Sequence, residues 1–103
     1  MARIKLKATV RPQSLVILAA VANVAAPLAH PVEVWITSGN DSKHMTGSRH
    51  YEDKALDVRS KNFPTRKAKR AFLAAVLLRL GPAYEGFLEQ EGKLQEHFHI
   101  EAR

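Results

Sequence analysis

The chain has 103 residues, the size of one small domain, and its hydrophobic fraction of 46% is ordinary for a globular protein. It contains no cysteine, which excludes a disulfide framework and a thiolate zinc site and leaves His, Asp and Glu as metal ligands. The net charge of +6 predicts an anionic partner. No nucleic-acid-binding motif accompanies the basic residues, so we expect a single domain, 1–103, without a nucleic-acid partner.

The N-terminal third predicts a strand, a helix and a second strand. Residues 3–10 read as a strand, because basic and apolar side chains alternate over 3–8 with a period of two. Pro12 can occupy the first turn of a helix, and 13–26 are apolar on most sides, which indicates a largely buried helix. Residues 32–37 alternate again, with Trp35 on the face opposite the aliphatic side chains, where it either covers the sheet or lines a cleft.

The basic start and the apolar run at 15–29 also have features of a signal peptide, but the alternation at 3–10 favours a strand, and we expect no signal peptide. The same run is too short and too interrupted to predict a membrane span.

The remainder of the chain predicts a loop, a strand, a helix and a hairpin. Residues 38–49 have loop composition, and 54–60 read as a short strand. A helix is expected over 64–80, since Pro64 can open it and Gly81-Pro82 follow it. Residues 84–90 and 95–102 predict a C-terminal β-hairpin. We therefore expect an α+β domain, a largely antiparallel sheet covered by two helices.

Two places in the chain carry candidate chemistry. His97 and His99 are two apart on a predicted strand, so both rings project from one face, an arrangement that can present nitrogen to zinc. His50 lies seven residues before Asp57, a carboxylate between apolar neighbours that would be costly if it had no partner. Two histidines and one aspartate leave a fourth position open, as a catalytic zinc site requires.

The order and spacing of these residues resemble the M15-type zinc peptidases, which include the D-Ala-D-Ala carboxypeptidases and the phage L-alanyl-D-glutamate endolysins. The likeness consists of S-x-H, then A-x-D seven residues after the His, then a late E-x-x-H that overlaps H-x-H, and it runs from about residue 34 to 101. It implies a hedgehog-like metal-site fold and a phage-encoded enzyme of the host cytoplasm or virion that cuts bacterial peptidoglycan.

Carried over by position, the resemblance implies roles for individual residues. The zinc ligands would be His50, Asp57 and His99, with Glu96 as general base and His97 orienting substrate or stabilising the oxyanion. Three further residues would support the first ligand or bind substrate: Ser48, Arg49 and Tyr51.

This chain departs from the pattern at several positions. The family usually has Gly at Asp53, and the loop that often supplies a substrate-binding Arg reads Ser-Gly-Asn-Asp at 38–41. The clamp for a substrate carboxylate would then be Arg49, Arg59 or Lys43, or be absent, which favours an endopeptidase over a carboxypeptidase.

Strand parity raises a separate difficulty for the general base. On a regular strand Glu96 points away from His97 and His99, so it serves as base only if the chain is bulged there. Glu89, on the partner strand, is the alternative base.

Two alternatives to the enzyme remain open at this level. A non-catalytic zinc-containing module of a virion, or one that binds the cell wall, would share the fold. A small DNA-binding protein would leave the histidine spacing unexplained. The basic cluster at 66–70 is either a solvated helix face or a docking surface for an anionic polymer.

Overall fold

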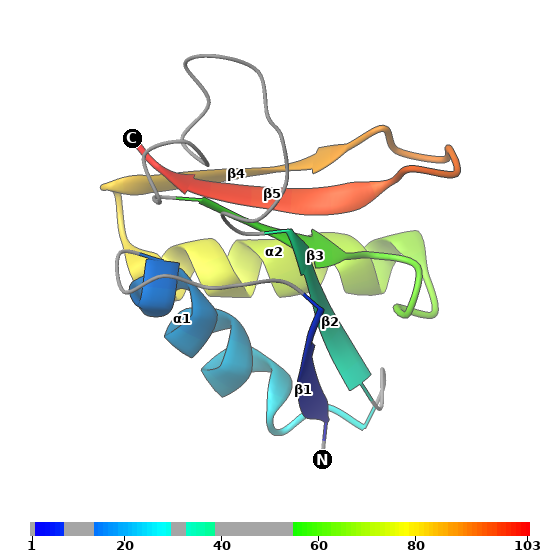
Figure 1. Ribbon diagram of the computed structural model, residues 1–103, viewed down its shortest axis with the longest axis horizontal. Coiled ribbons are helices and arrows are strands. Elements are labelled where there is room, and N and C mark those ends of the chain that lie inside the picture. The colour runs from blue at the N-terminus through cyan, green and yellow to red at the C-terminus, as the bar shows by residue number, and fades with distance from the viewer. Residues whose placement is uncertain (1, 8–13, 30–32, 39–54) are drawn as a thin grey trace.

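A computed structural model describes residues 2–7, 14–29, 33–38 and 55–103. These residues form five strands and two helices (Figure 1), in the order β1 (Arg3–Leu6), α1 (Leu15–Ala25), β2 (Glu33–Ser38), β3 (Ala55–Arg59), α2 (Arg66–Leu80), β4 (Tyr84–Glu89) and β5 (His97–Ala102). No helix within the described ranges is long and apolar enough to cross a membrane.

The strands form one sheet in the order β1-β2-β3-β5-β4. β1 runs parallel to β2, and the other three pairings are antiparallel. The predicted α+β class and the C-terminal hairpin, β4 with β5, are therefore confirmed. The parallel contact arises because α1 carries the chain back across the sheet between β1 and β2, as a crossover between parallel strands requires.

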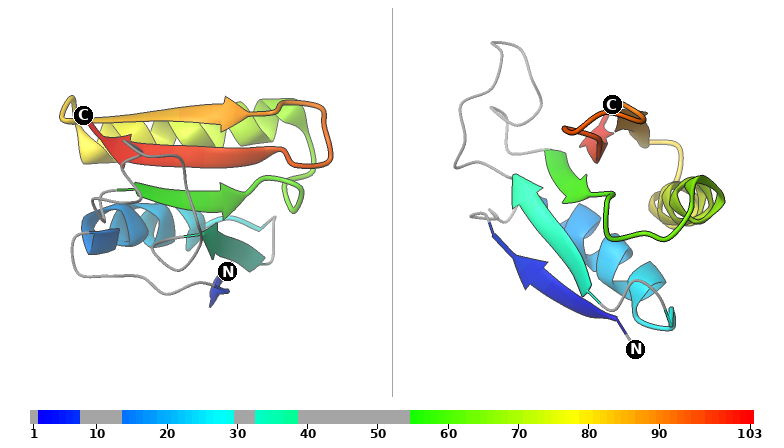
Figure 2. Two further views of the ribbon diagram at one scale, coloured as in Figure 1. Left: turned by 45° about the horizontal axis from the view of Figure 1, so that its top comes forward. Right: turned by 90° about the vertical axis from the view of Figure 1, so that its right-hand side faces the viewer.

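Both helices cover the same face of the sheet (Figures 1 and 2), and the core lies between the sheet and the helices. Alternate strand residues point into this layer and are fully buried, as a period of two requires: Val34, Ile36, Leu56, Val58, Phe98 and Ile100. Three aromatic rings join α2 to β5, because Phe63 packs on Phe72 at 4.7 Å and on Phe98 at 5.3 Å between ring centroids. The odd-numbered residues of β3 and β5 consequently lie on the opposite face, which neither helix covers and which we call the open face.

The limits of α2 follow from local chemistry. The Thr65 side chain accepts a hydrogen bond from the backbone N–H of Ala68 and caps the N-terminus. Gly81 ends the helix with a positive φ of 88°, a conformation that favours glycine, and its N–H bonds to the carbonyl of Leu77.

The basic cluster at 66–70 does not form a free docking surface. Arg66 and Arg70 both pair with Glu91, and Lys69 pairs with Glu96. Three of its four cations therefore hold the start of α2 to the turn between β4 and β5, and this also offsets the unfavourable helix dipole at that end.

Candidate functional site

The open face of the sheet brings four predicted site residues together across three strands. Asp57 on β3 lies directly opposite His99 on β5, and Glu89 on β4 lies opposite His97. Residues paired in this way project from the same face with their Cβ atoms about 5 Å apart. Asp57 and His99 are separated by 42 residues in the chain, so only the sheet register makes them neighbours.

His99 is the centre of this cluster. Its Nδ1 donates to Asp57 Oδ1 at 2.8 Å, and its Nε2 donates to Glu101 Oε1 at 2.6 Å. A carboxylate only accepts, so both ring nitrogens carry a proton. Burial alone would lower the pKa of His99, but the hydrogen bonds to Asp57 and Glu101 and the negative charges of Asp57 and Glu89 outweigh it and raise the pKa to about 9.

His97 lies beside His99 with its outer nitrogen turned toward the carboxylates. Its Nδ1 lies 2.8 Å from the backbone carbonyl oxygen of Gln95, which only accepts, so Nδ1 bears the proton. The Nε2 atom is then directed into the cluster, 3.4 Å from Glu89 Oε1 and 3.9 Å from Asp57 Oδ1. The Gln95 contact fixes both the orientation of the ring and the nitrogen that faces a ligand.

Glu96, the expected general base, lies on the other face of the sheet. Its carboxylate accepts hydrogen bonds from Ser60 Oγ at 2.6 Å, from Lys69 Nζ and from the backbone N–H of Gly92 at 2.8 Å. Burial would raise the pKa of Glu96, but these bonds outweigh it and lower the pKa to about 2. A carboxylate held in this way is a weak base and is directed away from His97 and His99. Of the two candidate bases, Glu89 is therefore the one that lies beside His97 and His99.

The remaining predicted residues lie outside the described ranges, so their placement stays a prediction. They are Ser48, Arg49, His50 and Tyr51, together with Lys43 and Asp53.

The donor set of the described residues fits part of a zinc site. In a tetrahedral zinc site, an imidazole nitrogen and a carboxylate oxygen are separated by about 3.3 Å. Nδ1 of His99 and Oδ1 of Asp57 already face each other at 2.8 Å, with a proton between them. Replacing that proton by a metal would need a separation of about half an ångström more. Within the described ranges, no three His, Asp or Glu side chains form a complete metal-binding group, and the expected third ligand is His50.

Glu101 also belongs to the cluster, although the sequence pattern assigned it no role. It holds Nε2 of His99 and so turns Nδ1 toward Asp57, the arrangement in which a carboxylate orients a metal-binding histidine. The signal was present in the sequence, because Glu101 is two residues after His99 on a strand and must share its face.

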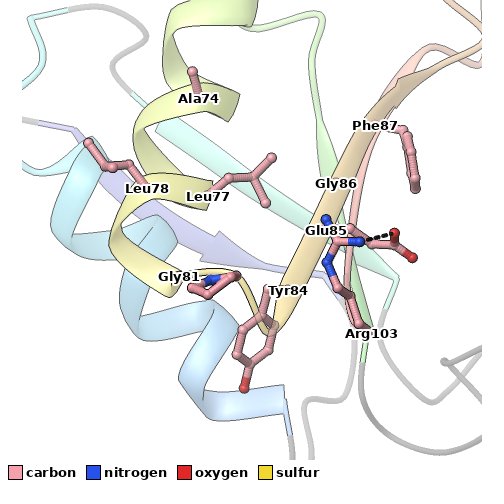
Figure 3. A pocket seen from close by; sticks show the side chains of 10 residues that line it. Ala74, Leu77, Leu78, Gly81, Tyr84, Glu85, Gly86, Phe87 and Arg103 are labelled. Atoms are coloured by element: carbon pink, nitrogen blue, oxygen red, sulfur yellow. Dashed lines mark ion pairs between the residues drawn. The ribbon is translucent and has the colours of Figure 1, made fainter.

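A cavity of about 320 Å³ opens beside the cluster and is lined by Asp57, His97, Arg59 and Lys61, among others. A larger one, about 610 Å³, lies between α2 and β4 and is lined mainly by apolar side chains such as Leu77, Leu78 and Phe87 (Figure 3). Its charged groups are Glu85 and Arg103, which pair with each other at 3.6 Å. No histidine is among the described residues that line it, so the smaller cavity is the candidate site for chemistry.

The site is thus an imidazole and carboxylate cluster on the open face of the sheet, with a cavity beside it. Comparisons with family models, with curated proteins and with solved structures find no match for this chain.

Proposed function

We propose that the protein is a zinc-dependent peptidase that hydrolyses an amide bond in the peptide stems of bacterial peptidoglycan, as a phage-type endopeptidase. The observation that carries the proposal is the meeting of Asp57 and His99, 2.8 Å apart on neighbouring strands, with His97 and Glu89 beside them. The choice of peptidoglycan rests on the resemblance of the motifs to M15-type peptidases.

In this proposal His50, Asp57 and His99 hold the metal. When bound, zinc supplies Lewis-acid polarisation of the scissile carbonyl and lowers the pKa of a water molecule toward about 7. Asp57 and His99 contribute one oxygen and one nitrogen from adjacent strands of a rigid sheet, and Glu101 keeps the His99 ring in place.

Glu89 takes the proton of the attacking water. Its Oε1 lies 3.4 Å from His97 and 3.6 Å from His99, and its side chain is 46% exposed, so it can reach a water molecule at the cluster. His97, in its protonated form, donates from Nε2 to the oxygen that becomes negatively charged as the tetrahedral intermediate forms. The protonated base then returns its proton to the leaving amine.

The test combines metal analysis with hydrolysis of a defined muropeptide. Asp57→Asn should lose stoichiometric zinc and hydrolysis together, whereas Glu89→Gln should retain zinc and lose about 100-fold or more in kcat. Glu85→Gln is the matched control, since Glu85 is on the same strand and face as Glu89 but pairs with Arg103 outside the cluster. Protein that binds no zinc, with hydrolysis unaffected by chelator and by Asp57→Asn, would refute the proposal.

One observation favours a non-catalytic, zinc-containing module that binds the cell wall or belongs to a virion. The carboxylate at the position of the family's base, Glu96, is engaged in a buried ion pair with Lys69. Zinc content is common to both functions, so turnover of the muropeptide by the zinc-loaded protein separates them.

A further inference from the structure

The open face of the sheet carries a second group of side chains beside the cluster, arranged around the only tryptophan of the chain. Lys5, Lys7 and Arg59 each place their cationic group 4.6 Å from the centroid of the Trp35 ring. A single contact of this kind is a common cation–π interaction. Three cations around one ring repel one another, and a negatively charged group bound beside them would offset this repulsion.

The described part of the chain supplies little of that charge. Glu33 is the nearby carboxylate, and it accepts a hydrogen bond from Trp35 Nε1 at 3.0 Å and pairs with Arg3 at 3.4 Å. No described carboxylate forms an ion pair with Lys5, Lys7 or Arg59. Within the described ranges, the charge of these three cations is therefore not neutralised by an ion pair.

The sheet register joins this group to the cluster in one row. Lys5 lies opposite Trp35, and the pairing of Ile36 with Val58 places Trp35 beside Arg59. Arg59 in turn lies opposite His97. Arg59 also lines the cavity of about 320 Å³ together with His97 and Asp57. A ligand held at Arg59 therefore extends directly toward the site of the proposed reaction.

We propose that Lys5, Lys7, Trp35 and Arg59 form a subsite that binds the acidic groups of the peptide substrate. This inference rests on the proposed function, and it assigns to Arg59 the carboxylate clamp. The guanidinium can bind a carboxylate with two parallel hydrogen bonds while its plane stays on the indole, and the two lysines add positive charge for a second acidic group.

The same face argues against a nucleic acid as the ligand. Beyond Arg59 the row continues through His97 to Glu89, and Asp57 lies in the neighbouring row opposite His99, so these carboxylates would repel a continuous phosphate backbone. The basic surface spans β1 to β3, about 10 Å at the usual spacing between strands, which suits one or two acidic groups.

Trp35 provides a direct readout, because it is the only tryptophan and lies within the subsite. Metal-free protein is titrated with a short peptide that carries two carboxylates and with the same peptide fully amidated, and tryptophan fluorescence and heat of binding are recorded. We expect the acidic peptide alone to bind, and to bind more weakly as salt is raised. Lys5→Gln with Lys7→Gln should weaken binding about threefold to tenfold, since exposed charges contribute modestly.

Two variants complete the experiment. Arg59→Lys keeps the charge but loses the planar contact, and should weaken binding about tenfold. Lys67→Gln with Arg79→Gln removes the same charge from α2, which covers the other face of the sheet, and should leave the affinity unchanged.

Equal binding of the acidic and amidated peptides, or tighter binding of a single-stranded oligonucleotide of equal charge, would overturn the inference. So would an unchanged affinity in the Lys5 and Lys7 double variant. Peptide binding without hydrolysis by the zinc-loaded protein would count against the proposed function and leave the subsite standing. Hydrolysis with a KM that is unchanged in the Lys5 and Lys7 double variant would support the proposed function and count against the subsite.

Discussion

Replacing Glu96 by Gln separates a structural role from a catalytic one. The Glu96 carboxylate is 5% exposed and is held by Lys69, Ser60 and the N–H of Gly92. These contacts lower its pKa from 4.5 to about 2. At about 1.4 kcal/mol for each pH unit, that difference corresponds to about 3 kcal/mol of stability. We expect Glu96→Gln to lower the free energy of unfolding by about this amount at pH 7, and the urea midpoint by about 1–3 M.

The sign of the pH dependence follows from the lowered pKa. The contribution of Glu96 is complete above its unfolded pKa of 4.5 and is lost as the pH falls toward 2, because the native state then has to accept a proton. Urea unfolding of the wild type and of Glu96→Gln should therefore differ most at neutral pH and converge at about pH 2.

A matched control lies in the same turn. Glu91 pairs with Arg66 and Arg70, but its side chain is 28% exposed, so Glu91→Gln should cost less than about 1 kcal/mol. The reasoning is refuted if Glu96→Gln is as stable as the wild type and abolishes hydrolysis while Glu89→Gln remains active. That result would make Glu96 the base after all.

Three further predictions test separate parts of the structure. Glu101→Gln should weaken zinc binding about tenfold to 100-fold at constant pH, measured by competition with a chelator, because the His99 ring loses its charged partner. Unchanged zinc affinity would remove Glu101 from the site. Gly86→Ala should lower the melting temperature by several degrees or more, since the added Cβ would lie 3.1 Å from Leu73 and 3.3 Å from the backbone oxygen of His99. A fully stable variant would contradict this close packing of α2 on β4. Thr65→Ala should destabilise by about 1 kcal/mol in urea unfolding, through loss of the cap on Ala68, and Thr65→Ser should restore most of it.

The sequence alone was sufficient for the secondary structure of the described residues, for the α+β class and for the C-terminal hairpin. Side-chain alternation located the strands, and Pro64 with Gly81-Pro82 bounded α2 to within two residues. On a regular strand, parity directs Glu96 away from His97 and His99, and its contact with Lys69 shows this orientation, whereas the family resemblance had made Glu96 the base. These features depend on local periodicity, which a sequence displays directly.

Only the tertiary structure decided which distant residues meet. Nothing local places Asp57 opposite His99 or aligns Trp35 with Arg59, because these contacts depend on the register between strands that are not joined by a hairpin turn. The same applies to the basic cluster at 66–70, whose pairing with Glu91 and Glu96 depends on how α2 lies on the hairpin. The sequence therefore determined which side chains share a face of each strand. The order and register of the strands determined which of them form the candidate site, because pairing energy is shared among many long-range contacts that no short segment contains.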